Sequence, residues 1–305
     1  MTKPTVGFIV GPTASGKTAL SINVAKALNA EIISADSIQI YKNLDIGSAK
    51  PSLEEREGIV HHLLDFLPAG DTFSVADFQK MALSKIDSII SRGKFPLVVG
   101  GTGLYVNSLI YPLKFEESTT DNELRERLNA LSNDKLHAML YEKDQKTALR
   151  LHKNDKKRIV RALEIIELSE SKTVPDDFEN SKNAEIAILP RIIGINQERE
   201  VLYDRINKRV DLMMENGLLS EVKSLLESGL TSESQSMQGL GYKQLIKHLN
   251  GEYTLDEAVE RIKVETRHFA KRQLTWFRRD ERIHWLKHDE HDIMLNEALN
   301  FLRGE

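Results

Sequence analysis

Residues 11–18 read GPTASGKT and have the composition of a phosphate-binding loop. They fit the pattern G-x-x-x-x-G-K-S/T, in which glycines let successive backbone N–H groups turn towards one anion. Lys17 would supply a positive charge to the phosphates, and Thr18 a hydroxyl group to Mg²⁺. A chance glycine-lysine turn is the alternative, but an apolar strand pattern precedes this loop and a helical pattern follows it. The expected phosphate-binding residues are Gly11, Pro12, Thr13, Ala14, Ser15, Gly16, Lys17 and Thr18.

The carboxylate that accompanies this loop is not where nucleotide hydrolases usually carry one. ATPases and GTPases have an apolar strand that ends in an Asp, which helps to hold the metal. Here the pattern PLVVGG ends in Gly100, Gly101 and Thr102, and the acid, Asp36, follows the pattern EIISA instead. Because the carboxyl ends of parallel strands line one crevice, we expect Asp36, Thr102 and Lys17 to converge. On the residues alone, two roles fit Asp36 equally: a reacting carboxylate, or a helix cap or partner of the metal.

Residues 267–282 combine positive charge with aromatic side chains. Basic groups bind nucleic-acid phosphates irrespective of sequence, and an aromatic ring can support an unstacked base. For Trp276 and Phe277 we prefer a place in the core or in a wall, because Phe and Trp at helical spacing are more often buried. The basic residues of this segment are Arg267, Lys271, Arg272, Arg278, Arg279 and Arg282.

A second basic segment lies at residues 156–161, which read KKRIVR. Lys157 and Arg161 are four residues apart, so in a helix they share one face. Such a face could bind RNA phosphates, or it could simply be a charged surface in contact with water. The residues alone leave both interpretations open.

Apolar runs predict the strands that position these groups. Helical patterns alternate with them, and Ser74 and Asp77 form a capping-box-like start for one helix. Strands that alternate with helices predict a parallel sheet with helices on both faces. The predicted fold class is therefore α/β, with a P-loop NTPase-like parallel sheet core. The predicted strands cover residues 6–11, 31–36, 95–101, 186–195 and 283–287, and the later helices about 198–216, 218–228, 241–249 and 255–278.

The pattern changes near residue 118. From Thr120 to Ser169 the sequence is helical and charged, with capping signals at Thr120 and around Asp155. A polar segment, ESKTVPDDFENSKN at residues 170–183, closes this part, and strand-like sequence then resumes. The most economical interpretation is a helical lobe inserted into an α/β core. We predict a core made of residues 1–120 and 191–305 and a helical insertion domain at residues 121–190.

Composition excludes several classes of protein. The chain has 305 residues and a net charge of −4, which does not exclude nucleic acid because binding needs only a local basic patch. The absence of cysteine excludes disulfides, thiolate metal sites and a Cys nucleophile. The N-terminus shows no signal-peptide pattern, and no apolar run approaches the ~20 residues of a membrane span. We therefore expect a cytoplasmic protein without a membrane partner, and we treat His61 and His62 as structural residues.

Several longer motifs make a resemblance specific. In order along the chain they read GPTASGKT, SADSIQIYKNLDIGSAKP, HHLLD, FSVADF, PLVVGGTGLY, HKNDKKRIVRALE, GLGYKQL and AKRQLTWFR. In these motifs the sequence closely resembles the tRNA dimethylallyltransferases, also called tRNA isopentenyltransferases or the IPP transferase family. The resemblance covers nearly the whole chain, from about residue 6 to about residue 286.

The resemblance implies a reaction. The loop would hold dimethylallyl diphosphate with Mg²⁺ at Thr18, and the exocyclic N6 amine of the tRNA adenosine just 3′ of the anticodon would attack the allylic carbon. Carried over from the family motifs, Asp36 is the base that accepts the amine proton, Thr102 contacts the region of the target nucleotide, and Arg209 contacts the diphosphate. Without the resemblance, Arg209 would be read as a surface charge on an amphipathic helix. We expect a monomer that binds the tRNA anticodon stem-loop.

The same motifs imply the residues that contact tRNA. Gly239 and Gly241 among them would allow a close approach of the backbone. The implied residues are Asp36, Ser37, Ile38, Gln39, Lys157, Arg158, Ile159, Val160, Arg161, Gln238, Gly239, Leu240, Gly241, Tyr242, Lys243, Lys271, Arg272, Gln273, Leu274, Thr275, Trp276, Phe277 and Arg278.

The sequence departs from the family pattern in two places. The run SESKTVP stands where many members have Ser-Gly-Lys, which leaves the exit of the inserted lobe undefined, and Phe66-Leu67-Pro68 replaces an Asp-Pro pair. Neither departure touches the matched catalytic positions. Three alternatives remain: a P-loop small-molecule kinase, a non-catalytic RNA-binding protein and an adenylate isopentenyltransferase. The missing Asp-ended strand disfavours the first, the complete loop with Asp36 disfavours the second, and the basic segments disfavour the third.

Overall fold

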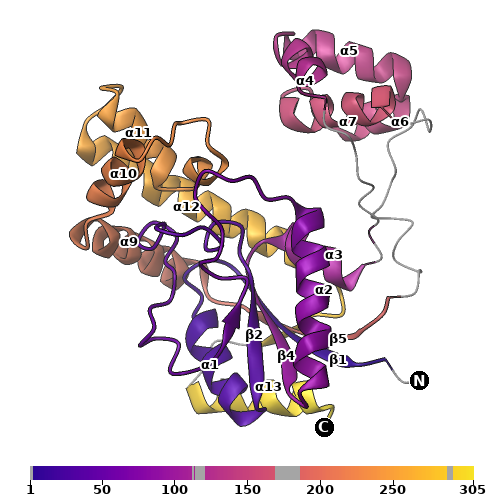
Figure 1. Ribbon diagram of the computed structural model, residues 1–305, viewed down its shortest axis with the longest axis vertical. Coiled ribbons are helices and arrows are strands. Elements are labelled where there is room, and N and C mark those ends of the chain that lie inside the picture. Colours follow the sequence, from indigo (N-terminus) through magenta and orange to yellow (C-terminus); the bar gives the residue numbers. More distant parts are fainter. Residues whose placement is uncertain (1–2, 112, 114–120, 169–185, 287–290) are drawn as a thin grey trace. The chain divides into compact units, whose positions relative to one another are not determined.

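The computed structural model describes residues 3–111, 113, 121–168, 186–286 and 291–305 (Figure 1). The contacts within the chain divide it into a larger unit, Met1–Ile110 with Ile186–Glu305, and a smaller unit, Tyr111–Glu185. The capping signal predicted at Thr120, the polar segment 170–183 and the last residue of the predicted strand 283–287 lie outside the described residues.

The larger unit is built on a parallel sheet. Its strands are β1 (Thr5–Val10), β2 (Ala30–Ala35), β3 (His61–His62), β4 (Phe95–Gly100), β5 (Leu189–Ile195) and β6 (His284–Leu286). They lie in the order β3-β2-β4-β1-β5-β6, and every pair of neighbours is parallel. The α/β fold class with a parallel sheet is therefore confirmed. Strand β3 was not predicted, because it consists of two histidines and offers no apolar run.

Helices make up the rest of the larger unit, and some of them pack on the sheet. They are α1 (Lys17–Ala27), α2 (Val75–Ser91), α3 (Gly103–Ile110), α9 (Arg199–Glu215), α10 (Leu218–Glu227), the 3₁₀ helix η1 (Gln235–Gln238), α11 (Tyr242–Leu249), α12 (Leu255–Phe277) and α13 (His291–Arg303). Helices α1 and α13 contact each other and pack on the sheet, and α2 packs beside α3 (Figure 1). The capping box predicted at the start of α2 is confirmed, since Ser74 and Asp77 bond each other's backbone N–H groups.

The core of the larger unit lies between the sheet and helices α1 and α13. Alternate residues of three central strands, Ile9, Ile32 and Leu97, meet Val24 of α1 and Leu299 of α13 there. The residues next to them in each strand are also buried, as expected for a sheet that is covered on both faces. This rigid layer fixes the ends of β1, β2 and β4, where the polar residues of the sequence motifs begin. Among the described residues, no helix is both long and apolar enough to span a membrane.

The smaller unit consists of helices with a core of their own. They are α4 (Asn122–Asn129), α5 (Asn133–Lys143), α6 (Gln145–Arg150) and α7 (Lys156–Leu168). Leu128, Leu136 and Leu163 are among its buried apolar residues. The buried carboxylate of Glu164 is paired with Arg125, whose Nε lies 2.6 Å from Oε1 and whose Nη2 lies 2.9 Å from Oε2. A buried charge requires such a partner, so this pair supports the packing of α4 against α7.

Candidate active site

The loop after β1 has the backbone of a phosphate cradle. Ala14 and Gly16 both have positive φ angles, of 62° and 94°, and Gly16 is the N-cap of α1. A side chain at Gly16 would be strained because L-residues rarely adopt this conformation. Lys17 Nζ donates hydrogen bonds to the carbonyl oxygens of Gly11, at 3.0 Å, and Pro12, at 2.6 Å. The lysine thus folds back over the loop, which places its charge at the cradle.

Two arginines of α9 add positive charge to the cradle. Arg209 Nη1 lies 3.3 Å from the hydroxyl oxygen of Thr13, and Arg205 lines the same cavity one helical turn earlier. Burial and the neighbouring charge of Arg209 lower the pKa of Lys17 to about 7, although Asp36 opposes the shift. Burial and the charge of Arg205 also lower the pKa of Arg209. Cations that depress one another's pKa values favour a multivalent anion between them.

The sequence did not identify Arg205. The signal was nevertheless present, because Arg205 and Arg209 are four residues apart and must share one face of a helix. That face carries Leu202 and Ile206 into contact with Ala14 of the loop. The apolar contact explains why these arginines reach the cradle and do not point into water.

Asp36 and Thr102 lie at the adjoining ends of β2 and β4. Asp36 Oδ1 accepts hydrogen bonds from the backbone N–H groups of Ile38, at 2.8 Å, and Gln39, at 3.2 Å. Thr102 Oγ1 accepts one from the N–H of Ser37, at 3.1 Å. Asp36 therefore anchors a local turn with one oxygen, and this fixes the direction of its carboxylate. Within the described residues, no hydrogen bond to its other oxygen, Oδ2, is found.

One cavity brings these groups together. Its volume is about 740 Å³, and Lys17, Asp36, Thr102 and Arg209 all line it, as the convergence of parallel strand ends predicts. Polar groups of the loop line one part of the wall, and apolar side chains line others. Those apolar residues include Ile22, Val99, Val210, Met213, Leu240 and Phe269. A cavity with both kinds of wall can hold a ligand that has a charged end and an apolar end.

Gln273 has a contact that the sequence did not suggest. It is 7% exposed, and its Oε1 accepts a hydrogen bond from the N–H of Thr13 at 2.9 Å. Its Nε2 donates to the carbonyl oxygen of Gly101, also at 2.9 Å. A Cβ atom at Gly101 would lie 2.2 Å from this Nε2 atom, so a larger residue there would displace the amide group of Gln273. Gln273 therefore joins α12 to both the phosphate cradle and the end of β4.

The segments implied to contact tRNA contain both inward and outward side chains. In α7, Ile159 and Val160 belong to the core of the smaller unit, at 0% and 4% exposure. Lys157 and Arg158 are exposed, and Arg161 Nη1 lies 3.5 Å from Glu164 Oε2. We therefore restrict the proposed RNA contacts of α7 to the side chains of the three basic residues, because the two apolar ones face inward.

The glycines of the GLGY segment have intramolecular roles. Tyr242 is fully buried, and its ring occupies the space where Gly47 and Gly239 would carry side chains. Gly241 has a φ angle of 93°, and its N–H donates to Gln244 Oε1 at 2.9 Å at the start of α11. Within the chain, the close approach at Gly239 is made by the ring of Tyr242. Gln238, Gly239, Leu240, Gly241 and Lys243 line the cavity.

The end of α12 presents a mixed face. Phe277 is 2% exposed and belongs to the core, as predicted, and Trp276 is half-buried with its ring where a side chain on Gly103 would lie. Lys271, Arg272, Thr275 and Arg278 are exposed, whereas Leu274 is half-buried. Only the exposed side chains are placed to meet a nucleic acid.

The residues present fit a metal ion that takes most of its ligands from the bound diphosphate and from water. Among the described residues, no group of three or more His, Asp or Glu side chains could hold a metal ion. The loop instead offers the Thr18 hydroxyl, which is exposed and lines the cavity together with Asp36. Magnesium usually keeps waters and takes a few protein oxygens together with phosphate oxygens, so this donor set suits it. His61 is hydrogen-bonded to the carbonyl oxygen of Ile59, and His62 to the carboxylate of Glu31, at the edge of the sheet.

Comparisons with known proteins agree on one family. A family model described as IPP transferase matches residues 39–280. A protein named tRNA dimethylallyltransferase from Acetivibrio thermocellus is 51% identical over 292 residues, which cover 93% of this chain and 92% of the relative. A protein of the same name from Bacillus velezensis is 49% identical over 287 residues, or 93% of this chain and 90% of the relative.

Solved structures of similar proteins extend over the same length. The tRNA isopentenylpyrophosphate transferase of Bacillus halodurans is 41% identical, with a TM-score of 0.76 and coverage of 99% of this chain and 96% of that one. A eukaryotic dimethylallyltransferase acting on tRNA is 28% identical, with a TM-score of 0.81 and coverage of 99% and 80%. The similarity therefore includes the larger and the smaller unit.

Proposed function

Because the chain belongs to the IPP transferase family, we propose that it transfers a dimethylallyl group from dimethylallyl diphosphate to tRNA. The acceptor is the exocyclic N6 of the adenosine just 3′ of the anticodon, and diphosphate is released. The observation that carries this proposal is the cavity, where a phosphate cradle with two arginines faces a carboxylate at a neighbouring strand end. A hydrolase of nucleotides has no need of that carboxylate in that place.

The cationic side of the cavity binds the leaving group. The diphosphate is neutralised both before and after its bond to the allylic carbon breaks. The groups that do so are the N–H groups of the loop, Lys17, Arg205 and Arg209. The guanidinium of Arg209 can bind two oxygens together because its donors lie in one plane. Charge that develops on the bridging oxygen is thus stabilised at fixed positions, which lowers the barrier to departure.

Asp36 accepts the proton in the proposed reaction. The N6 amine is a weak nucleophile because its lone pair is delocalised into the ring. As the new N–C bond forms, Asp36 Oδ2 takes a proton from this nitrogen, and the electron pair of the broken C–O bond leaves with the diphosphate. The turn held by Asp36 Oδ1 keeps the carboxylate in place for this step. Thr102 holds the end of the same turn through Ser37.

A divalent metal belongs to the proposed reaction, and Mg²⁺ suits the residues present. The Thr18 hydroxyl would hold it together with oxygens of the diphosphate. When bound, it supplies positive charge that favours departure of the diphosphate.

The tRNA is bound by basic side chains on both units. Lys157, Arg158 and Arg161 of the smaller unit and Lys271 and Arg272 of the larger one supply charge for the phosphates of the anticodon stem-loop. The target base leaves its stack to reach Asp36, as enzymes that modify bases generally require. A single chain carries every group that the proposed mechanism uses, so we propose that the monomer is active.

The decisive experiment omits nucleotides. The protein is mixed with Mg²⁺, unmodified tRNA and dimethylallyl diphosphate, and the tRNA is then digested and analysed by mass spectrometry. We expect N6-dimethylallyladenosine without any ATP, because the loop holds the diphosphate of the donor. Product that forms only with ATP, with ADP released in proportion, would overturn the proposal in favour of a kinase. Prenylation of free AMP but not of tRNA would favour an adenylate isopentenyltransferase.

A further inference from the structure

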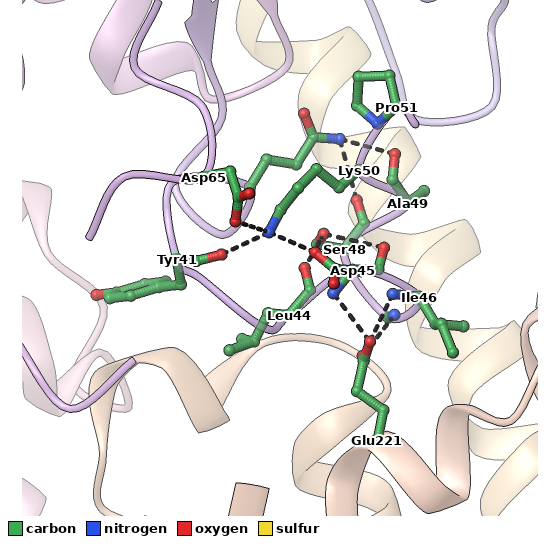
Figure 2. Close-up of polar contacts among 12 residues, drawn as sticks. Tyr41, Leu44, Asp45, Ile46, Ser48, Ala49, Lys50, Pro51, Asp65 and Glu221 are labelled. Carbon is green, nitrogen blue, oxygen red and sulfur yellow. Dashed lines mark hydrogen bonds and ion pairs between the residues drawn. The ribbon is translucent and has the colours of Figure 1, made fainter. Parts of the chain in front are cut away.

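A loop at residues 44–50, here called loop 44–50, forms part of the wall of the cavity. Gly47, Ser48 and Ala49 line the cavity next to residues 36–39, which contain the proposed base. The loop itself carries none of the groups used in the proposed mechanism. Its conformation is nevertheless fixed by polar contacts at both of its ends and at its middle (Figure 2).

Glu221 of α10 holds the first part of this loop. Its Oε2 accepts hydrogen bonds from the N–H groups of Asp45, at 2.9 Å, and Ile46, at 2.7 Å (Figure 2). Its Oε1 accepts from the N–H of Gly47, at 3.0 Å, and from the hydroxyl of Tyr242, at 2.7 Å. A single carboxylate therefore satisfies three successive backbone donors and one buried side chain. Hydrogen bonds to a charged acceptor are stronger than neutral ones, so this contact restricts the loop strongly.

The ring of Tyr242 packs against the same part of the loop. A Cβ atom at Gly47 would lie 2.6 Å from Tyr242 Cζ, so the backbone of Gly47 rests directly on the ring. Burial raises the pKa of Tyr242, and the neighbouring Glu221 raises it further. The hydroxyl thus keeps its proton and remains a donor to Glu221. The ring of Tyr242 and the carboxylate of Glu221 together restrict the backbone conformation of residues 45–47.

The second part of the loop is connected to Asp36. Gln39 Nε2 donates to the carbonyl oxygens of Ser48, at 3.1 Å, and Ala49, at 3.0 Å. Ala49 has a φ angle of 51°, which is uncommon for a residue other than glycine and persists only where neighbouring contacts require it. The N–H of the same Gln39 donates to Asp36 Oδ1 at 3.2 Å. A continuous set of hydrogen bonds therefore runs from loop 44–50 to the carboxylate.

Lys50 secures the far end of the loop. Its side chain is 3% exposed, and Nζ donates to the carbonyl oxygen of Tyr41 and to the carboxylates of Asp45 and Asp65, each at 2.7 Å (Figure 2). Because both ends are secured, the contact with Glu221 decides the shape of the middle part, which faces the cavity.

We propose that Glu221 is a positioning residue for the transfer reaction: it holds loop 44–50 in the one conformation that aligns Gln39 and, through it, Asp36. This inference rests on the proposed function, in which Asp36 accepts the amine proton. Glu221 does not touch the reacting atoms in this scheme. Its effect reaches them through the backbone of residues 45–49. Hydrogen bonds connect Glu221 to this backbone, the backbone to Gln39, and Gln39 to Asp36.

The test replaces the carboxylate without changing its size. In Glu221→Gln, an NH₂ group faces backbone N–H groups, so at least part of the contact is lost. We expect kcat with unmodified tRNA to fall about 10- to 100-fold, because small misplacements of reacting groups have effects of this order. The dissociation constant for dimethylallyl diphosphate should stay within about 2-fold, since among the described residues no hydrogen bond or ion pair joins the cradle or Arg209 to the loop. Glu227→Gln, at an exposed position of the same helix, is the matched control and should behave as wild type.

Hydrogen exchange provides a readout that does not depend on activity. In Glu221→Gln, the amides of residues 45–47 should exchange faster, while those of β1 and β4 keep their protection. If Glu221→Gln does not fold, Tyr242→Phe removes one donor and keeps the ring, and the same pattern should appear with a smaller loss of kcat. Full kcat in a folded variant, whether or not the amides exchange faster, would overturn the role of Glu221. A fall in donor affinity equal to the fall in kcat would also overturn it.

A double substitution distinguishes a shared path from separate damage. Gly47→Ala displaces the loop by its clash with Tyr242 and leaves the carboxylate of Glu221 itself unchanged. If both substitutions act through the loop, the double variant should lose little more activity than the worse single variant. Losses that multiply would contradict the proposal. Wild-type protein that forms no product would overturn the proposed function itself, whereas an active wild type with a fully active Glu221→Gln overturns only this inference.

Discussion

The side-chain carbonyl of Gln273 accepts a hydrogen bond from the backbone N–H of Thr13 at 2.9 Å, although 260 positions separate the two residues. The contact connects the last part of α12 to the phosphate cradle that follows β1. The same amide group holds Gly101 at the end of β4. A residue that lies in a basic segment implied to contact tRNA therefore holds the backbone of the phosphate cradle.

Replacement of Gln273 by Leu should weaken donor binding. The substitution leaves the N–H of Thr13 and the carbonyl of Gly101 buried without partners, which costs about 1–3 kcal/mol for each group. Urea denaturation should show the loss of stability, and equilibrium binding should show a lower affinity for dimethylallyl diphosphate. The exposed neighbour Thr275→Val is the control. Unchanged donor affinity in the Leu variant would remove Gln273 from the cradle.

Asp36→Asn should separate binding from chemistry. The Oδ1 atom of Asn can still accept from the N–H groups of Ile38 and Gln39, so the turn should survive. The side chain cannot accept the amine proton, and we expect transfer to fall by about 10²- to 10⁴-fold with donor binding retained. Single-turnover kinetics and donor titration measure the two quantities. Transfer at the wild-type rate would exclude Asp36 as the base.

Donor binding should depend on pH through Lys17. Its pKa is about 7 in the folded protein, below the ordinary value of 10.5, so between these values the free site carries a neutral lysine. A bound diphosphate favours the charged form and raises this pKa again, so binding above pH 7 takes up a proton. Calorimetry at pH 8 in two buffers of different ionisation enthalpy should detect net uptake, and affinity should fall as the pH rises further. Proton release at pH 8 would contradict this assignment.

Lys157→Gln should reduce the salt dependence of tRNA binding. Each lost phosphate contact lowers the slope of log affinity against log salt by about 0.7–0.9. Lys135→Gln removes the same charge from an exposed position of α5 in the same unit and is the matched control. Donor affinity should be unchanged in both variants. Equal slopes for Lys157→Gln and wild type would make the face of α7 an ordinary solvated surface.

Glu31 should make stability depend on acid pH. Burial alone would raise its pKa, but hydrogen bonds from Lys94, His62 and Arg92 outweigh this effect and lower the pKa to about 2. The carboxylate therefore stabilises the fold fully above about pH 4.5, and this contribution is lost as the pH falls towards 2. Glu31→Gln should lower the free energy of unfolding by on the order of 3 kcal/mol at pH 7.

The dependence on pH provides the check for Glu31. The difference in unfolding free energy between Glu31→Gln and wild type should shrink as the pH falls below 5. Glu57→Gln breaks an exposed ion pair with Lys26 and should cost less than about 1 kcal/mol. Urea denaturation at pH 7 and at pH 4 measures all these values, and a difference for Glu31 that does not change with pH would refute the ionic explanation.

Local features made much of the fold predictable. The apolar runs of β1, β2 and β4 and the spacing of glycines in residues 11–18 depend only on neighbours in the sequence. The capping box of α2 is a contact between residues three apart. Strand β3 escaped prediction because hydrogen bonding to β2, and not an apolar pattern, makes two histidines a strand.

The candidate site was predictable as a set of segments, but the direction of each side chain was not. The motif around α7 contains both exposed Lys157 and buried Ile159, and the GLGY motif places Tyr242 in the core. A sequence motif identifies neighbouring positions but does not show which way their side chains point, because a helix directs successive side chains to different faces. Arg205 was the one omission that helical spacing could have revealed.

The sequence by itself determined the chemistry that is available: a phosphate cradle, a carboxylate at a strand end and basic segments on helices. Only the tertiary structure decided which distant groups hold these parts in place. Gln273 reaches Thr13, and Glu221 reaches Asp45, across 260 and 176 positions respectively. Neither contact has a local signature, because a glutamine or glutamate on a helix looks the same whether it meets water or a backbone N–H group. The packing of α9, α10, α11 and α12 against one another determines the outcome, since it places these side chains within hydrogen-bond distance of the loops that form the site.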